Sequence, residues 1–271
     1  MSITLSYDTD QCVIDYPAWE GYYSKAVLAI EPIMLEYGYE IHDNGISYDY
    51  RVCVIDRSIL TETEAVDLES FIYGHRGLDI NMAIGTDSNF FPFGPDKGDT
   101  GTFVIKILDR KFGPFDQFKQ FDKSWVLKLV TPPAYVLPSV TNQDSFQIGT
   151  VDGLLYPQAG INPDRDFGIK HSLSYGGTNY YIDKRDNIHT TSFTQVCNEG
   201  LAAELFQFLT SANGRDQDIT IIAPDDYYLF GPENGAGGTF TCRLIQKEIE
   251  CRQLNYEEFE IPLNFFMVSE A

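Results

Sequence analysis

Short runs in which hydrophobic and polar residues alternate recur along the chain, and glycine, proline or small polar residues bound most of them. A period of two places alternate side chains on opposite faces of a strand, so these runs predict β-strands. The predicted strands cover residues 48–56, 79–85, 102–109, 124–131, 218–224, 239–247 and 259–268. Pro262 has no N–H to donate to a sheet, so it predicts that the last of these is an edge or bulged strand.

Two segments carry apolar residues at helical spacing instead. The first begins at Thr61, which forms a capping-box motif with Glu64 three residues later, and the second begins at Asn198. Glycines at 77 and 214 predict where the helices end. The apolar stripes are Ala65, Leu68, Phe71 and Ile72 in the first helix, and Ala202, Leu205, Phe208 and Leu209 in the second. Helices this short need a surface to pack against.

The chain contains an internal repeat. Glu64–Asp109 aligns without a gap with Leu201–Gln246, and 13 of the 46 aligned positions are identical. The identities include the Phe-Gly-Pro sequence at 93–95 and 230–232, and a later Gly-Thr-Phe sequence. Apolar positions align with apolar positions and glycine with glycine. The repeat therefore predicts two copies of one domain.

Each copy reads as a strand, a helix and then several strands. This order predicts a mainly β (α+β) fold: two tandem homologous antiparallel β-sandwich domains, each with one flanking α-helix, at residues 1–135 and 136–271. Between them, Thr131–Asp144 contains three prolines and a polar tail, which is typical of a stiff, extended linker.

Charge and cysteine usage narrow the function classes. The net charge of −21 argues against a nucleic-acid binder of the usual basic kind, but it would suit a wall past which nucleic acid slides. Five cysteines without a CxxC motif favour reduced, buried thiols in a cytoplasmic protein. The first twelve residues do not resemble a signal peptide, and no apolar run approaches the roughly 20 residues of a membrane span.

The sequence contains no recognisable catalytic motif. None of its histidines, His42, His75, His171 and His189, lies in a metal-binding or catalytic pattern. The glycine-rich stretch 231–238 does not have the strand–helix context of a phosphate loop, so a flexible hairpin loop is the better interpretation. The stretch 96–101 lacks the spacing of a calcium loop, and the second copy has neither of its aspartates. We therefore expect no enzyme activity, no cofactor and no metal.

Aromatic residues around the Phe-Gly-Pro turns are the candidate contact residues. Aromatics are enriched at the energetically important positions of protein interfaces, although the same residues could form the core and rim of a strand end. The candidate subunit interface consists of Phe90, Phe91, Phe93, Pro95, Tyr227, Tyr228, Phe230 and Pro232.

The repeated unit resembles the distal or minor tail proteins of long-tailed bacteriophages, in particular the lambda-type minor tail protein M group. The resemblance covers most of each half and lies in soft patterns. These are a Gly-Tyr segment before a strand, a Leu-x-x-Phe-Leu helix with a glycine shortly after it, and an aromatic strand with a Pro-bearing turn. The matching positions are Gly38-Tyr39, Leu68, Phe71, Ile72 and Gly77, and then Tyr175-Gly176, Leu205, Phe208, Leu209 and Gly214. The family usually has one copy and a Thr-Pro-Pro turn.

The resemblance implies a tail-tube-like fold in which strands of neighbouring subunits line a DNA channel. It implies a structural virion protein, assembled in the host cytoplasm, that forms a ring at the distal end of the tail and joins the tail tube to the tip or hub. The implied partners are further copies of itself, as a trimer with six domains or a hexamer, together with the tail tube protein and tip or hub proteins. Viral DNA would pass through the lumen without specific binding.

Two other functions stay open. Duplicated β-sandwiches with exposed aromatic residues also serve as carbohydrate- or receptor-binding modules. A cell-wall hydrolase is a third alternative, but the sequence shows no paired acid and base for it.

Overall fold

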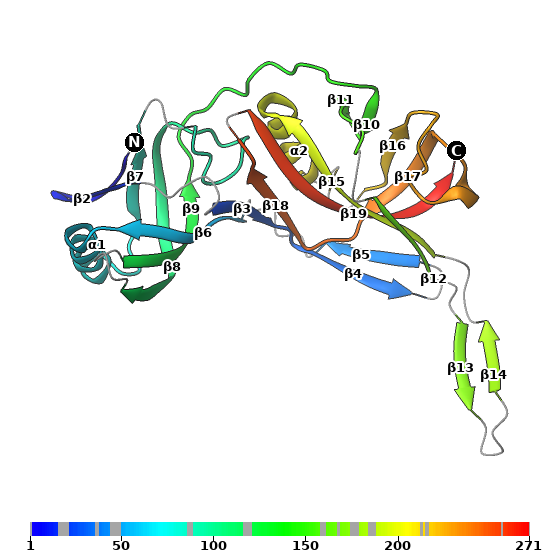
Figure 1. Cartoon of the computed structure of the whole chain (residues 1–271), viewed down its shortest axis with the longest axis horizontal. Coiled ribbons are helices and arrows are strands. Elements are labelled where there is room, and N and C mark those ends of the chain that lie inside the picture. Colours follow the sequence, from blue (N-terminus) through cyan, green and yellow to red (C-terminus); the bar gives the residue numbers. More distant parts are fainter. Residues whose placement is uncertain are drawn as a thin grey trace.

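The fold is mainly β, with two α-helices in the part of the chain that the computed structural model describes. The described residues are 2–15, 22–35, 38–43, 50–85, 89–115, 121–157, 161–166, 169–173, 179–183, 188–211, 214, 217–255 and 257–270. Two halves lie side by side along the longest axis, with α1 in one and α2 in the other (Figure 1). Tyr175 and Gly176, which carry part of the family resemblance, lie outside the described residues.

The first half holds α1 and the strands up to β9. Its elements are β1 (Ser2–Tyr7), β2 (Asp10–Asp15), β3 (Tyr22–Val27), β4 (Ile30–Leu35), β5 (Gly38–Asp43), β6 (Tyr50–Leu60), α1 (Glu62–Gly74), β7 (Ile80–Ile84), β8 (Gly101–Phe115) and β9 (Phe121–Thr131).

The second half holds α2 and the remaining strands. Its elements are β10 (Phe146–Ile148), β11 (Val151–Leu154), β12 (Asn162–Asp166), β13 (Ile169–Leu173), β14 (Asn179–Asp183), β15 (Ile188–Asn198), α2 (Glu199–Thr210), β16 (Ile219–Ala223), the 3₁₀ turn η2 (Pro232–Asn234), β17 (Gly238–Leu244), β18 (Glu248–Gln253) and β19 (Glu258–Glu270).

Fifteen of the described strands form one antiparallel sheet that runs through both halves. In the first half the hydrogen-bonded order is β2-β1-β7-β8-β9-β6-β3. In the second half it is β11-β10-β16-β17-β19-β15-β12. Each strand therefore has a counterpart in the other half at the same place in the order.

Two hairpins extend this pattern beyond the sheet. Strands β4 and β5 pair with each other between β3 and β6, and β13 and β14 pair between β12 and β15. The β13–β14 hairpin projects away from the body, whereas β4–β5 runs beneath the second half (Figure 1). There the ring of Tyr39 lies 5.5 Å from that of Phe266, centroid to centroid.

Both helices begin where the sequence predicts. The hydroxyl of Thr61 accepts a hydrogen bond from Glu64 N, and the Glu64 carboxylate accepts one from Thr61 N, so the capping box forms. Asn198 caps α2 by accepting from Leu201 N at 3.0 Å.

Neither helix in the described part of the chain combines the length and the hydrophobicity that a membrane-spanning helix needs.

Each half has its own hydrophobic core. One cluster draws only on residues of the first half, including the α1 stripe and β1, β6, β7, β8 and β9. The other cluster packs α2 against the second-half strands, and it also takes in four residues of the first half. Those four are Ala26, Leu28, Ile30 and Phe91. The second core therefore extends across the junction between the halves.

The halves differ where β8 of the first half corresponds to two strands of the second. β8 pairs with β9 from Val104 to Phe115, whereas β17 and β18 divide this role against β19. Pro262 lies where β19 passes from one partner to the other, and on its other side it pairs with Thr194. Of the two alternatives predicted from Pro262, an edge strand is therefore wrong, whereas β19 does have a register shift against β17, opposite Thr241 and Cys242. Strand β19 is central, and proline is accommodated because neither β17 nor β18 pairs with it there.

Candidate functional site: the junction between the two halves

The halves are joined edge to edge by β3 and β18. Glu248–Cys251 pair in antiparallel register with Ser24–Val27. Just beyond the strands, Leu28 N donates to Lys247 O at 2.8 Å. Because β3 also pairs with β6, and β18 with β19, the sheet is continuous from one half to the other.

Side chains reinforce this backbone joint. Lys25 Nζ lies 2.7 Å from Glu248 Oε2 and 3.1 Å from Glu250 Oε1. The hydrogen bond to Glu248 is the main cause that raises the pKa of Lys25. Beside it, the hydroxyl of Tyr22 donates to Gln253 Oε1 in a buried contact. Each of these bonds links the first half to the second.

A buried ion pair lies behind the joint. Arg51 donates to Asp96 through two parallel bonds, Nη1 to Oδ1 and Nη2 to Oδ2, both 2.9 Å long. Their side chains are 1% and 2% exposed. Arg51 also donates to Phe93 O, and this satisfies a further guanidinium N–H within the first half. Such a pair tolerates burial only when hydrogen bonds satisfy both ions.

Helix α2 of the second half closes this ion pair from water. The guanidinium carbon of Arg51 lies 4.5 Å from the centroid of the Phe206 ring, and Arg51 Nη2 donates to Thr210 Oγ1 at 3.2 Å. Gly94 permits the approach, because a Cβ there would lie 2.8 Å from the Phe206 ring, and its φ of +105° suits glycine. The first-half ion pair thus depends on second-half side chains for its burial.

Phe91 is the aromatic contact across the junction. Its ring meets that of Phe259 edge to face, with centroids 5.2 Å apart, and Ser24 Oγ donates to Phe91 O at 3.0 Å. Phe90 and Phe93 instead belong to the first-half core, and Pro95 is buried. Of the three aromatic residues predicted in the first copy, Phe91 is thus the one that belongs to the core of the other half.

The linker covers the outside of the junction. Tyr135 donates from its hydroxyl to Glu199 Oε1 at 2.8 Å, and burial raises the pKa of this tyrosine. Gly98 leaves space for the Tyr135 ring, and Gly200 leaves space for the backbone of Ser139. The path of the linker over both halves is visible at the top of Figure 1.

The second Phe-Gly-Pro loop has similar local geometry but a different environment. Phe230 lies in the second-half core, 5.2 Å from Phe240, as Phe93 lies 5.6 Å from Phe103. Tyr227 stacks on Tyr156. Tyr228 is 51% exposed, and Pro232 at the start of η2 is exposed too.

Sequence reasoning missed the polar part of the junction. Arg51 is the one basic residue of the predicted strand 48–56 and is followed by four apolar residues, which is the signal that could have identified it. Lys25 and Glu248 gave no such signal, because exposed charges on strands are common. The pairing of β3 with β18 joins segments near opposite ends of the chain and follows from no local pattern.

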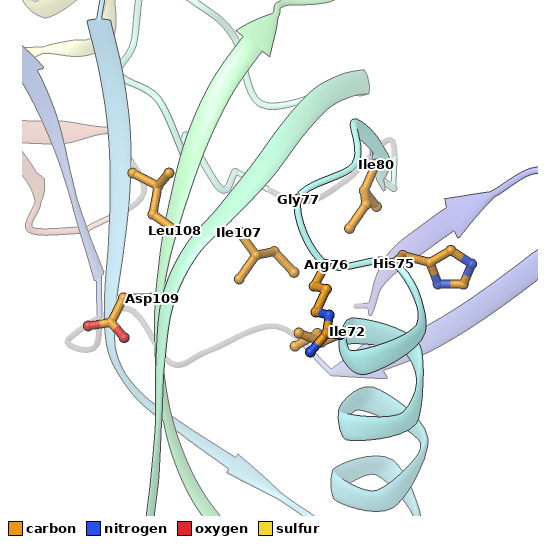
Figure 2. A pocket seen from close by; sticks show the side chains of 8 residues that line it. All are labelled: Ile72, His75, Arg76, Gly77, Ile80, Ile107, Leu108 and Asp109. Carbon is orange, nitrogen blue, oxygen red and sulfur yellow. The ribbon is translucent and has the colours of Figure 1, made fainter.

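Figure 2 shows an open pocket of about 340 Å³ beside the end of α1. Its polar residues do not converge: the His75 ring and the Asp109 carboxylate lie on opposite sides and point away from each other. His75 instead contacts Phe71 O through Nδ1 and Asp10 Oδ2 through Nε2. The pocket offers no acid and base at a common point, which general acid–base catalysis would require.

All five cysteines are buried and form no disulfide. Burial raises the pKa of Cys12 to about 11 and that of Cys197 to about 12, so both stay protonated and unreactive at neutral pH. Within the described ranges, no group of three or more His, Cys, Asp or Glu side chains is arranged to hold a metal ion.

Comparisons with known proteins add no family. No protein-family model matches the chain, and no curated protein matches it either. Among solved structures, the K. pneumonia MrkH structure in its apo state aligns at a TM-score of 0.17 and 9% identity, over 98% of this chain and 78% of that one. A superposition this loose carries no argument about fold or function.

Proposed function

We propose that the chain is a structural, ring-forming component of a bacteriophage tail, built from two homologous copies of a tail-tube-like domain. The observation that supports this most is the junction itself. The two halves have the same strand order and are joined side by side, because β3 of the first half pairs with β18 of the second. These two strands are not counterparts of each other, so the joint uses a different edge of each half. Units that join through two different edges can continue in the same direction and close into a ring.

The charge of the chain fits a channel for DNA. A net charge of −21 would keep a ring lumen from binding the phosphate backbone, so that DNA passes without being held. In this proposal the ring joins the tail tube to the tip or hub proteins. Three chains would supply six domains, and six chains would supply twelve.

Mass photometry and negative-stain electron microscopy of the purified chain test this function. We expect closed rings of three or six chains with a central hole. A protein that remains a single chain at micromolar concentration would contradict the ring. If such a monomer were retained on immobilised glycans or host cells, the carbohydrate- or receptor-binding alternative would take its place.

A further inference from the structure

The internal junction is formed by two unlike faces. The β3 face belongs to the first half and consists of β3, Phe91 and the Arg51–Asp96 pair. The α2 face belongs to the second half and consists of β18, Phe259 and the side of α2 that carries Phe206 and Thr210. Since the halves repeat the same strand order, each face has a counterpart in the other half, and neither counterpart takes part in this junction.

The counterpart of the α2 face lies on α1. The ungapped repeat aligns the two helices so that their N-caps, Thr61 and Asn198, coincide. Ala203 is fully buried, but its counterpart Val66 is 60% exposed. The counterpart of Thr210 is Tyr73, which is 64% exposed. The counterpart of Phe206 is the exposed Glu69, so the side of α1 that corresponds to the junction side of α2 presents an aliphatic, an acidic and an aromatic side chain to solvent.

The counterpart of the β3 face lies around the second Phe-Gly-Pro loop. Phe91 is 3% exposed, whereas its counterpart Tyr228 is 51% exposed. The counterpart of the Arg51–Asp96 pair is His189 with Glu233, whose nearest N and O atoms are 3.8 Å apart. Their side chains are 14% and 39% exposed, against 1% and 2% for the first pair. A histidine–carboxylate contact thus recurs at this position without the covering helix.

The strands that would continue the sheet also have counterparts. Strand β12 pairs with β15 as β3 pairs with β6, and it has no second partner among the described strands. The end of β8 corresponds to β18, because Phe115 pairs with Phe121 as Gln253 pairs with Phe259. Hence β12 and the end of β8 would be the edges of a repeated joint.

On balance, the two edges carry charges of opposite sign. In the internal joint a lysine of β3 lies between two glutamates of β18. In the counterpart, Asp164 and Asp166 occupy alternate positions of β12. On the other edge, Arg110 and Lys111 lie in the end of β8, before the register shift between Phe112 and Phe115. The signs are exchanged relative to the internal joint: β12 has two aspartates around Arg165, and the end of β8 has two basic residues.

We infer that the β12 face of one chain (β12, Tyr228, His189 and Glu233) binds the α1 face of a second copy (Val66, Tyr73 and the end of β8), repeating the internal junction between chains. This inference rests on the proposed ring and names the surfaces that close it. Tyr228 would pack near the start of β9 of the next chain, where the counterpart of Phe259 stands. The contact is head to tail, because its two surfaces differ.

A mixing experiment with two variants tests this pairing. Tyr228→Asp damages the β12 face and leaves the α1 face intact, and Val66→Asp does the reverse. Both side chains are exposed, so circular dichroism should show folded protein. Each variant alone is expected to weaken association about tenfold or more and to run as a single chain by mass photometry. In an equimolar mixture, the intact β12 face of the Val66→Asp chain can bind the intact α1 face of the Tyr228→Asp chain. The resulting dimer has only damaged faces left, so assembly should stop at two chains. Val136→Asp, at an 88% exposed linker position, is the control and should keep the wild-type mass.

The outcomes separate this interface from the ring itself. If the wild type forms rings and both variants do so equally well, the ring stands and this interface is wrong. A mixture that stays monomeric, or either variant pairing with itself, would overturn the head-to-tail pairing. A wild-type chain that never assembles would overturn both proposals.

Discussion

The two Phe-Gly-Pro loops share half of their residues at positions 90–103 and 227–240, yet Phe91 in one is buried and its counterpart Tyr228 in the other is exposed. Phe91 lies against Phe259, and Arg51–Asp96 lies under α2, while Tyr228 meets solvent. The loops themselves do not cause this difference. Only the first loop has the other half of the chain beside it. Comparison of equivalent positions therefore separates what a side chain contributes to its own domain from what it contributes to a junction.

The largest difference is expected between the Arg51–Asp96 ion pair and its counterpart, the His189–Glu233 contact. Arg51→Ala leaves the Asp96 carboxylate buried without its partner and should lower the free energy of unfolding by about 3–5 kcal/mol. His189→Ala, at the more exposed counterpart, should cost less than about 1 kcal/mol. Urea denaturation measures both, in a Val66→Asp background so that assembly does not add to stability. Equal losses at the two sites would contradict the comparison.

The aromatic pair should give the next largest difference. Phe91→Ala removes a buried ring that packs on Phe259 and should cost about 3 kcal/mol. Tyr228→Ala should change the same quantity by less than about 0.5 kcal/mol, because its side chain is half exposed. Denaturation curves in the same background provide the measurement. A loss at Tyr228 as large as that at Phe91 would show that Tyr228 is already packed within one chain.

A matched pair of glycines separates backbone strain from contact with the linker. Gly98 and Gly235 are counterparts with φ values of +85° and +80°. Alanine is strained at both, which costs about 1 kcal/mol. At Gly98 its Cβ also meets the Tyr135 ring, whereas nothing lies within 4 Å at Gly235. We expect Gly98→Ala to cost about 2 kcal/mol and Gly235→Ala about 1 kcal/mol in thermal or urea unfolding. A reversed order would exclude the linker contact.

The helix caps should give the smallest difference. Thr61→Ala removes the capping box of α1 and should cost about 1 kcal/mol. Asn198→Ala should cost slightly more, because Asn198 Nδ2 also donates to Thr141 O of the linker. If the loss at Asn198 is the smaller of the two, the bond to the linker does not stabilise the fold.

Sequence patterns predicted the local elements well and the long-range ones poorly. Both helix starts follow from side-chain capping, which depends on residues three positions apart. The ungapped alignment of the two copies does not match the structure between the helix and the Phe-Gly-Pro loop. Ile84 pairs with Gly101 as Ala223 pairs with Gly238, so the sheet register matches Ile84 with Ala223 rather than with Ile221. The turn after α2 is longer than the turn after α1, and the loop after β16 is shorter than the loop after β7. These two differences cancel, so the sequence match resumes and hides the change of register.

The junction could not have been predicted from either copy alone. Phe91 and Tyr228 occupy equivalent positions and both carry an aromatic ring, so the ring alone does not predict their difference in burial, which depends also on what lies beside them. The same holds for Arg51, whose burial needs α2 from the other half. At Pro262 the sequence predicted fewer neighbouring strands than the structure has. A central strand can contain proline at the point where one neighbouring strand replaces another.

Photo-cross-linking from position 228 tests the repeated junction most directly. A benzoylphenylalanine in place of Tyr228 would react with whatever packs there, and mixing with isotope-labelled wild-type chains would distinguish cross-links between chains from those within one. We expect inter-chain cross-links to peptides of α1 or of the start of β9. Cross-links confined to the second half of the partner, or none in protein that has assembled, would contradict it.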